Sequence, residues 1–297
     1  MSSIRRIASI ASSVVLLAAA LAPLSAQGPT APLVVSTSWL AEHLTDPGVV
    51  VVHVDNRDYT KGHIPGAREV PYSALTIRRG SVSTELPEPD SLRSLFSALG
   101  ISDASHVVVY AEEGPRATRL LYTLAYLGHA KYSLLDGGLD QWKAEQRTVT
   151  KDVPVIVPGV MTPRTLRPVV ADADWVLARL DKPGLALIDT RTTGEYNGTG
   201  NRSGMPSAGH LAGAHQLEWE QLFADGNVRL KPRAELERLY AERAKPGDTV
   251  VTYCWVGYRG SATWFVAHYL GYDARLYDGS YQDWSQRTLP SRPGATP

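Results

Sequence analysis

The chain carries the same order of motifs twice, and this repetition limits the folds that it can adopt. An apolar run ends in Asp-x-Arg at Asp55, and a second run does so at Asp189, 134 residues later. A His-[Ile/Leu]-x-Gly-Ala block follows each run and begins at His63 and at His210. Repetition of one order over this spacing indicates two copies of a single structural unit.

Within each copy, segments with the character of strands alternate with segments of helical character. Near-continuous apolar runs, which are typical of strands buried on both faces of a sheet, lie at residues 49–55, 106–110, 185–189 and 249–253. The predicted helices are residues 90–99, 117–127, 234–243 and 262–270. This alternation predicts an α/β protein in which each domain is a parallel sheet with helices on both faces.

A stretch rich in proline separates the two copies. Residues 148–168 hold four prolines and show no helical periodicity, so we expect an extended linker there. The predicted domains are therefore residues 33–147 and residues 169–297.

The start of the chain differs from the rest. Residues 1–26 combine two arginines, an apolar run and a small-residue exit, which predicts a secretory signal peptide. Cleavage is expected after Ala26, or alternatively after Ala22, and an uncleaved membrane anchor is the remaining alternative. The mature protein is expected to be exported, either periplasmic or secreted, without stable membrane association.

Composition excludes several functional classes. The 297 residues have a formal net charge of zero, so charge gives no case for binding nucleic acid or an acidic membrane surface. One cysteine excludes an internal disulfide and a thiolate-rich metal site, and the eight histidines form no His-x-x-x-His pair. We expect no metal or other cofactor, and a monomer.

The second copy holds the only cysteine, Cys254, directly after the predicted strand at 249–253. Ser261 is expected to cap the following helix and Gly271 to end it, so Cys254 lies on a short loop before a helix N-terminus. Backbone amides in such a loop favour negative charge, and Arg259 adds a positive charge five residues further on. Both effects favour the reactive thiolate form.

The alternative is that Cys254 is a small buried hydrophobe, which is the usual state of a free cysteine. Comparison of the two copies favours the reactive interpretation, because their loops align 143 residues apart. Ala111 then stands in the place of Cys254, and Arg116 in the place of Arg259. The duplication therefore predicts one copy with a nucleophile and one copy without.

Taken in order, these motifs resemble a tandem-domain sulfurtransferase of the rhodanese family over residues 33–284. The specific pieces are the Asp-x-Arg and His-[Ile/Leu]-x-Gly-Ala motifs in both copies and the Cys254-x-x-Gly-x-Arg259-Gly-Ser loop. The resemblance implies two rhodanese-like domains, an inactive N-terminal one and a catalytic C-terminal one. It also implies that Cys254 takes sulfur from a small anionic donor such as thiosulfate, forms a persulfide, and passes the sulfur to a thiophilic acceptor, cyanide or a thiol.

The expected donor-binding residues follow Cys254, where loop amides and Arg259 would stabilise the persulfide anion. Trp255 and Tyr258 are expected to line the mouth of the site. Arg191 is a further candidate for donor contact, although the alternative is that it braces the loop through Asp189. The candidate loop residues are Trp255, Val256, Gly257, Tyr258, Arg259 and Gly260.

Departures from the family pattern leave several donors open. Trp255 and Val256 replace basic residues of the mammalian-type thiosulfate enzymes, and Glu195 stands where those enzymes have an arginine. The loop resembles that of bacterial thiosulfate sulfurtransferases, so we favour thiosulfate over 3-mercaptopyruvate. A non-enzymatic persulfide carrier is a further alternative. A Cys-dependent phosphatase is disfavoured, because it needs Cys-x5-Arg and Gly260 holds that arginine position.

Overall fold

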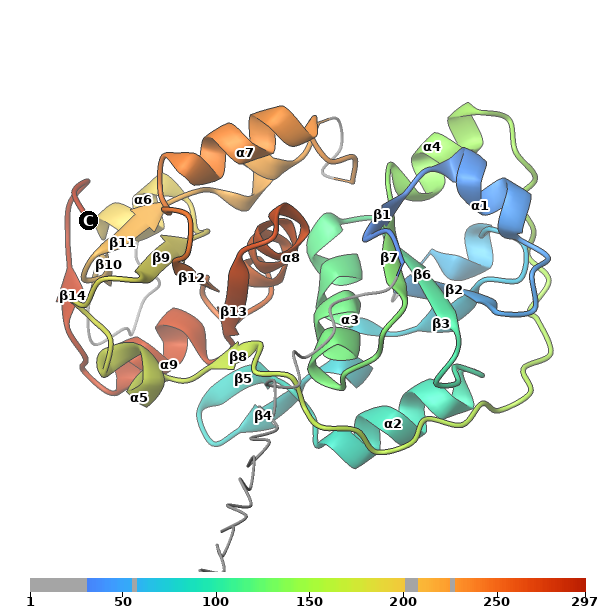
Figure 1. The fold of residues 1–297 in the computed structure, drawn as a ribbon, viewed down its shortest axis with the longest axis horizontal. Coiled ribbons are helices and arrows are strands. Elements are labelled where there is room, and N and C mark those ends of the chain that lie inside the picture. The colour runs from blue at the N-terminus through green and yellow to red at the C-terminus, as the bar shows by residue number, and fades with distance from the viewer. Residues whose placement is uncertain (1–30, 55–57, 201–207, 225–227) are drawn as a thin grey trace, which may run out of the picture.

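The computed structural model describes residues 31–54, 58–200, 208–224 and 228–297 (Figure 1). The expected signal peptide and the motif that begins at Asp55 lie outside the described residues. In the part of the chain that the structure describes, no helix has the length and apolar character needed to span a bilayer.

Two five-stranded sheets form the centres of the two halves, and both have the same strand order. Neighbouring strands are parallel in the orders β1-β7-β6-β2-β3 and β8-β13-β12-β9-β11. The first sheet consists of β1 (Val34–Val35), β2 (Val49–Val54), β3 (Arg68–Val70), β6 (His106–Tyr110) and β7 (Tyr132–Leu135). The second consists of β8 (Val170–Ala171), β9 (Leu185–Asp189), β11 (Ala214–Gln216), β12 (Thr249–Tyr253) and β13 (Asp273–Tyr277).

Helices cover both faces of each sheet, which confirms the predicted fold class. The inner faces share one apolar cluster with α2 (Pro89–Ala98), α3 (Gly114–Tyr126), α7 (Arg233–Ala241) and α8 (Gly260–Leu270). In Figure 1, α3 and α8 lie side by side between the sheets, and they contact each other. The outer faces carry α1 (Thr37–His43) and α4 (Gly138–Ala144) in the first half, and α5 (Ala173–Leu177) and α9 (Ser280–Gln286) in the second.

The remaining elements are short. The hairpin of β4 (Ile77–Arg79) and β5 (Val82–Glu85) belongs to the first half. In the second half, α6 (Thr193–Asn197) follows β9, and β10 (His210–Leu211) pairs with β14 (Ser291–Arg292). Short 3₁₀ turns lie at Tyr59–Lys61, Tyr72–Leu75 and Trp219–Leu222. Residues 148–168 form neither helix nor strand, as the proline content predicted, apart from a bridge between Thr150 and His63.

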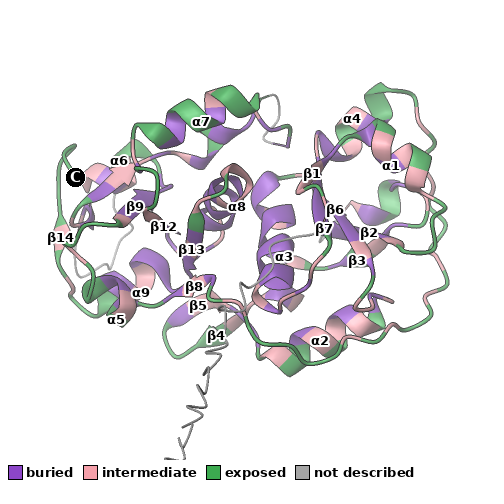
Figure 2. Cartoon of the chain, viewed as in Figure 1, coloured by how far each residue is buried: buried purple, intermediate pink, exposed green. Residues whose placement is uncertain are grey.

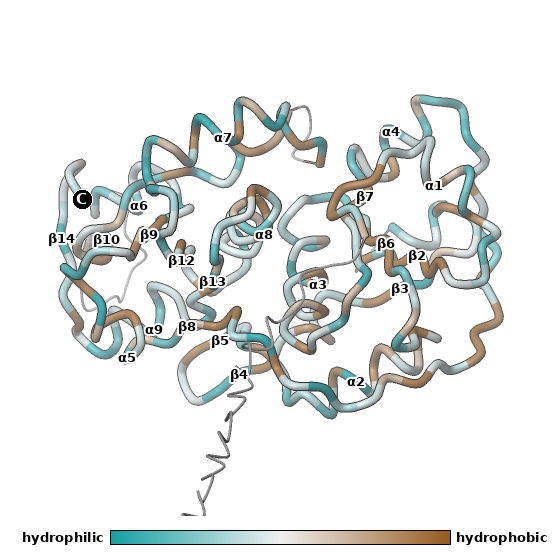
Figure 3. The backbone as a smooth tube through the Cα atoms, in the orientation of Figure 1, coloured by the Kyte–Doolittle hydropathy of each residue, from teal (hydrophilic) through white to brown (hydrophobic). Residues whose placement is uncertain are grey.

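The apolar runs become strands because both of their faces find a core. In β2, Val50, Val52 and Val54 belong to the inner cluster, whereas Val51 belongs to the outer one. Figure 2 shows these central strands buried, and Figure 3 shows their apolar character. The predicted strands at 106–110, 185–189 and 249–253 are confirmed without a change of bounds.

The helix starts differ from the prediction. The helix after Cys254 begins at Gly260, its N-cap is Arg259, and Ser261 lies in its first turn. The Ser261 hydroxyl donates to the Tyr258 carbonyl at 2.8 Å and so does not cap the helix. The expected end is confirmed, because Gly271 takes the left-handed conformation with φ of 97° at the C-cap.

The equivalence drawn between the two Asp-x-Arg motifs is wrong by two residues. In β2, His53 pairs with Tyr110, and in β9, Asp189 pairs with Tyr253 at the corresponding register position. His53 therefore occupies the place that Asp189 has in the second half. The sequence pattern misled because equal motifs do not fix the register of the strands that precede them.

The turns at the two His blocks have the same construction. The ring of His63 stacks on Tyr59 at 3.7 Å, and the ring of His210 stacks on Tyr196 at 3.7 Å. In each case histidine Nδ1 lies within hydrogen-bond distance of the tyrosine carbonyl, at 2.9 Å and 3.0 Å. These histidines therefore tie turns together in both halves.

A buried ion pair joins the two halves. Arg119 of α3 is fully buried and pairs with Asp278, which follows β13. The same carboxylate accepts the backbone N–H of Leu86 at 2.8 Å, and Arg119 donates to the Thr84 carbonyl at 2.8 Å. The hairpin β4–β5 is thereby held against the second half.

Replacing Arg119 with methionine is expected to lower the free energy of unfolding by about 3–5 kcal/mol, because it leaves the Asp278 carboxylate buried without its partner. Denaturant-induced unfolding measures the loss. The control is Arg238→Met, which removes an exposed pair with Glu242 and is expected to cost at most about 0.5 kcal/mol. Equal effects of the two substitutions would contradict this role of the interface.

Candidate active site

Cys254 lies where β12 ends and the loop to α8 begins. This is the carboxyl edge of a parallel sheet, where ligand sites of α/β proteins occur. Its side chain is buried, with 0% exposure. Burial alone fits either alternative from the sequence, a structural cysteine or a shielded nucleophile, so the surrounding groups must decide between them.

The backbone of Cys254 is bonded on both sides to the start of α9. Its N–H donates to Ser280 Oγ at 3.2 Å, and its carbonyl accepts the N–H of Tyr281 at 3.0 Å. The next carbonyl, that of Trp255, accepts the N–H of Gln282 at 3.0 Å. The nucleophile position is therefore held by an element that lies on the outer face of the sheet.

Two glycines let the loop pass close to its neighbours. Gly257 has φ of 78°, and a Cβ there would lie 2.7 Å from Asp278 Oδ1. A Cβ at Gly260 would lie 2.8 Å from the Leu276 side chain and 3.3 Å from the Tyr253 backbone. Glycine is thus required at both positions because neighbouring atoms leave no room for a Cβ. At Gly257 the left-handed backbone conformation also requires glycine.

The Arg259 side chain is held by Glu195. Its guanidinium donates to the two Glu195 oxygens at 2.7 Å and 2.9 Å. Burial lowers the pKa of Arg259, but the bonds to Glu195 and the negative charge of ionised Cys254 outweigh it and raise that pKa above its usual range.

Glu195 stays ionised beside Arg259. Burial raises the pKa of Glu195, but hydrogen bonding and the charge of Arg259 lower it to about 2. Glu195 also completes the capping box of α6 with Thr192. One carboxylate therefore starts a helix and holds the loop arginine.

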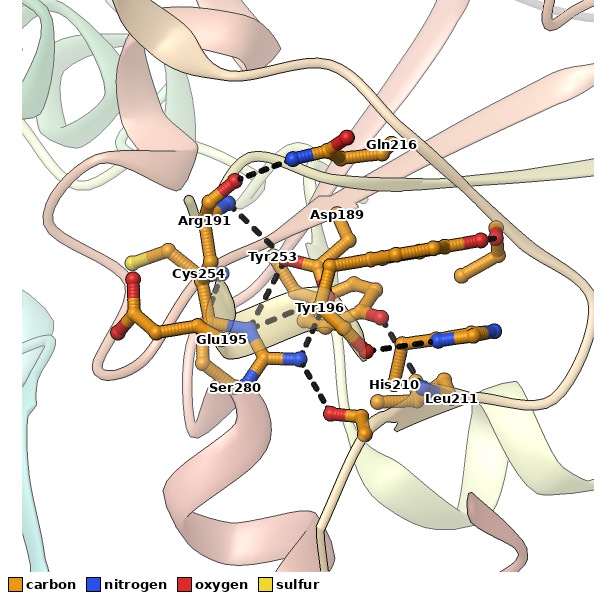
Figure 4. Close-up of polar contacts among 12 residues, drawn as sticks. Asp189, Arg191, Glu195, Tyr196, His210, Leu211, Gln216, Tyr253, Cys254 and Ser280 are labelled. Carbon is orange, nitrogen blue, oxygen red and sulfur yellow. Dashed lines mark hydrogen bonds and ion pairs between the residues drawn. The ribbon is translucent and has the colours of Figure 1, made fainter. Parts of the chain in front are cut away.

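The charged group of Arg191 is used in contacts with residues outside the loop 255–260. Its side chain is 1% exposed and forms an ion pair with Asp189, at 2.6 Å between Arg191 Nη2 and Asp189 Oδ2 (Figure 4). The same nitrogen donates to the Gly209 carbonyl at 2.7 Å, and the guanidinium lies 4.0 Å from the centre of the Tyr281 ring. These contacts favour the alternative that Arg191 braces the site rather than binding the donor.

Residues of the first half close over the loop. Glu113 accepts the Tyr258 hydroxyl at 2.6 Å, and the Tyr72 ring meets the Tyr258 ring edge-on at 5.2 Å. Thr84 donates to the Val256 carbonyl. Tyr72 and Thr84 carried no sequence signal, because their position depends on how the two halves dock. Trp255, expected at the mouth, is largely buried at 8% exposure.

The corresponding place in the first half has different chemistry. Ala111 and Glu112 line a cavity of about 130 Å³, to which Lys61, Lys143, Asp58 and Asp140 add two positive and two negative side chains. Glu112 is bonded to His53 at 2.6 Å. Within the described residues, no cluster of His, Cys, Asp and Glu could hold a metal ion.

The Glu195–Arg259 pair predicts a stability difference that depends on pH. A lowered carboxylate pKa contributes stability that is complete above the ordinary value of 4.5 and is lost as pH falls to about 2. The stability advantage of the native protein over Glu195→Gln is therefore expected to shrink across this range, by on the order of 3 kcal/mol.

Chemical denaturation at several pH values measures this difference. Glu237→Gln is the matched control, because Glu237 pairs with Arg233 at exposed positions and its effect should hardly change with pH. A constant difference between the native protein and Glu195→Gln would contradict the strength assigned to the pair.

Comparisons with known proteins agree with this architecture. A model of the Rhodanese-like domain matches residues 36–145 and 172–287. The thiosulfate sulfurtransferase of Corynebacterium glutamicum is 35% identical over 84% of this chain and 87% of its own length. The sulfur carrier protein TtuD of Thermus thermophilus is 34% identical over 85% of this chain and 93% of its own length.

A solved structure shows the same fold. The 3-mercaptopyruvate sulfotransferase SseA of Escherichia coli superposes with a TM-score of 0.73, at 25% identity, over 84% of this chain and 98% of that protein. The domain model matches twice, and the relatives align with this chain over most of their length. The chain therefore belongs to the rhodanese family of sulfurtransferases.

Proposed function

We propose that the protein transfers a sulfane sulfur from thiosulfate to a thiophilic acceptor, cyanide or a thiol, through a persulfide on Cys254. One observation carries the proposal. Cys254 sits at the carboxyl edge of its sheet, five residues before Arg259 on the same loop, whereas the corresponding residue of the first half is Ala111. The two halves thus differ at the atom on which this chemistry depends.

The reaction balances without an external oxidant. The Cys254 thiolate attacks the outer sulfur of thiosulfate, a new S–S bond forms, and the electron pair of the broken S–S bond leaves with sulfite. The acceptor then attacks the outer persulfide sulfur, and the electron pair returns to Cys254. Sulfite leaves without a proton, so no general acid is required.

The loop contributes electrostatic stabilisation of the persulfide anion in this proposal. Arg259 and the amides of residues 255–260 are its proposed donors, with Gly257 and Gly260 allowing the close turn. Glu195 offsets part of the Arg259 charge, and the aromatic rings of Tyr72 and Tyr258 meet at the loop. These features favour a small donor.

Two other functions have specific support. 3-Mercaptopyruvate is the alternative donor, because the Escherichia coli protein of the same fold carries that name. A persulfide carrier is the non-enzymatic alternative, because a relative is named a sulfur carrier protein and the Cys254 side chain is buried. Steady-state formation of thiocyanate from thiosulfate and cyanide supports the enzyme, whereas a stable persulfide without turnover supports the carrier.

Incubation with thiosulfate is expected to add one sulfur atom, about 32 Da, to the intact protein, because the mechanism passes through a covalent intermediate. Mass spectrometry measures the addition. Cys254→Ala should show neither the added mass nor thiocyanate formation, because no other thiol exists in the chain.

A second cysteine site serves as the control for that experiment. Ala111→Cys in the Cys254→Ala background should remain inactive, because Glu112 lies beside the new thiol and its negative charge opposes both a thiolate and an anionic donor. Sulfur transfer by Cys254→Ala itself would remove the basis of the mechanism.

We also propose that the mature protein is exported, to the periplasm or out of the cell, and acts as a monomer. The support for export is the sequence of residues 1–26, with its charged start and apolar run. N-terminal sequencing of the protein from a periplasmic extract is expected to begin near Gln27. A chain that keeps Met1 and stays in the cytoplasmic fraction would contradict export.

A further inference from the structure

Ser280 has a backbone conformation that normally belongs to glycine. It is the first residue of α9, it is fully buried, and its φ is 54°. A side chain in this left-handed region is strained, because Cβ approaches the backbone. The second half therefore keeps a serine at a position where glycine would be the unstrained choice.

The first half makes that unstrained choice. Asp136, Gly137 and Gly138 correspond in order to Asp278, Gly279 and Ser280, and Gly138 begins α4 with φ of 52°. The two halves thus share the left-handed conformation at the residue that begins this helix, although Gly137 and Gly279 before it differ, with φ of 76° and −61°. Only the half with the nucleophile has a side chain at that helix start.

The Ser280 side chain bonds to the backbone of the nucleophile. Its oxygen accepts the N–H of Cys254 at 3.2 Å; both residues are drawn in Figure 4. Its hydroxyl donates to the Tyr277 carbonyl at 2.8 Å. One hydroxyl thereby links the end of β13 to the start of the loop after β12. All three residues are buried, so these polar groups have little access to water as a replacement partner.

We propose that Ser280 is a positioning residue for sulfur transfer, and that its hydroxyl fixes the Cys254 backbone so that the thiolate keeps its aim at the donor. The proposal rests on the function proposed above. Ser280 acts through its hydrogen bond with the Cys254 backbone. A small displacement of a nucleophile reduces the reaction rate steeply, because the attacking atom must approach the donor sulfur at a defined distance and angle.

Strain and function account together for the difference between the halves. A glycine at residue 280 would relieve the backbone but would leave the Cys254 N–H and the Tyr277 carbonyl without their shared partner. In the first half, Ala111 has no nucleophilic group to position, so a strained side chain at residue 138 would bring no benefit. A purely structural serine would be equally useful in both halves.

The test uses three full-length variants. Ser280→Gly removes the hydroxyl and the strain, and Ser280→Ala removes the hydroxyl but keeps Cβ. The matched control is Gly138→Ser, which introduces the same strain in the first half, where a new Cβ would lie 3.3 Å from the Ala111 carbonyl oxygen. Thermal unfolding, steady-state kinetics with thiosulfate and cyanide, and the pH profile of Cys254 alkylation by iodoacetamide are measured for each.

Ser280→Gly is expected to unfold at a higher temperature than Ser280→Ala, because it alone relieves the backbone strain. It should nevertheless lose roughly tenfold in kcat with KM nearly unchanged, because donor contacts remain. Ser280→Ala should lose activity similarly and also stability. In both, the midpoint of the alkylation profile should shift from the native value, because the Cys254 backbone has lost its Ser280 partner. Gly138→Ser should lose stability without a change in kinetics or profile.

A folded Ser280→Gly protein with native kcat and a native alkylation midpoint would overturn the proposal. Alkylation needs no sulfur donor, so this measurement separates the two hypotheses. If the native protein forms no persulfide with thiosulfate, the proposed function fails, whereas a shifted midpoint in Ser280→Gly and Ser280→Ala would still support the positioning role.

Discussion

The buried ion pair between Arg119 and Asp278 is the contact on which the geometry of the reactive loop depends. The Asp278 carboxylate lies against Gly257, where a Cβ would have no room, and it also receives the Leu86 N–H from the first half. Removing two charges from water is costly, and this arrangement persists because hydrogen bonds from both halves satisfy them. The half without a nucleophile is therefore part of the framework of the site.

The two copies have kept their packing and diverged in their chemistry. Both retain the strand order and the turns in which a tyrosine stacks on a histidine. In both, the helix that follows β7 or β13 begins with a residue in the left-handed conformation. They differ at Ala111 against Cys254 and at His53 against Asp189. Core contacts tolerate few changes, whereas groups at the carboxyl edge of a sheet can change without disturbing the core.

Local sequence predicted the fold well and the docking of the halves poorly. The strands at 106–110, 185–189 and 249–253 were predictable because apolar runs must be buried on both faces. The start of α8 was misplaced because Ser261 uses its hydroxyl on the Tyr258 carbonyl. The contacts of Tyr72, Thr84 and Arg119 with the second half join residues far apart in sequence, so no local sequence pattern predicts them.

The bond between Tyr258 and Glu113 has a consequence for how such a duplicated chain can evolve. The first half supplies the Glu113 carboxylate that holds Tyr258 of the cysteine loop. A chain shortened to the second half would lose this contact and would leave the Asp278 carboxylate, which lies against Gly257, without its counter-charge. Loss of the first half would therefore also change the surroundings of the cysteine loop.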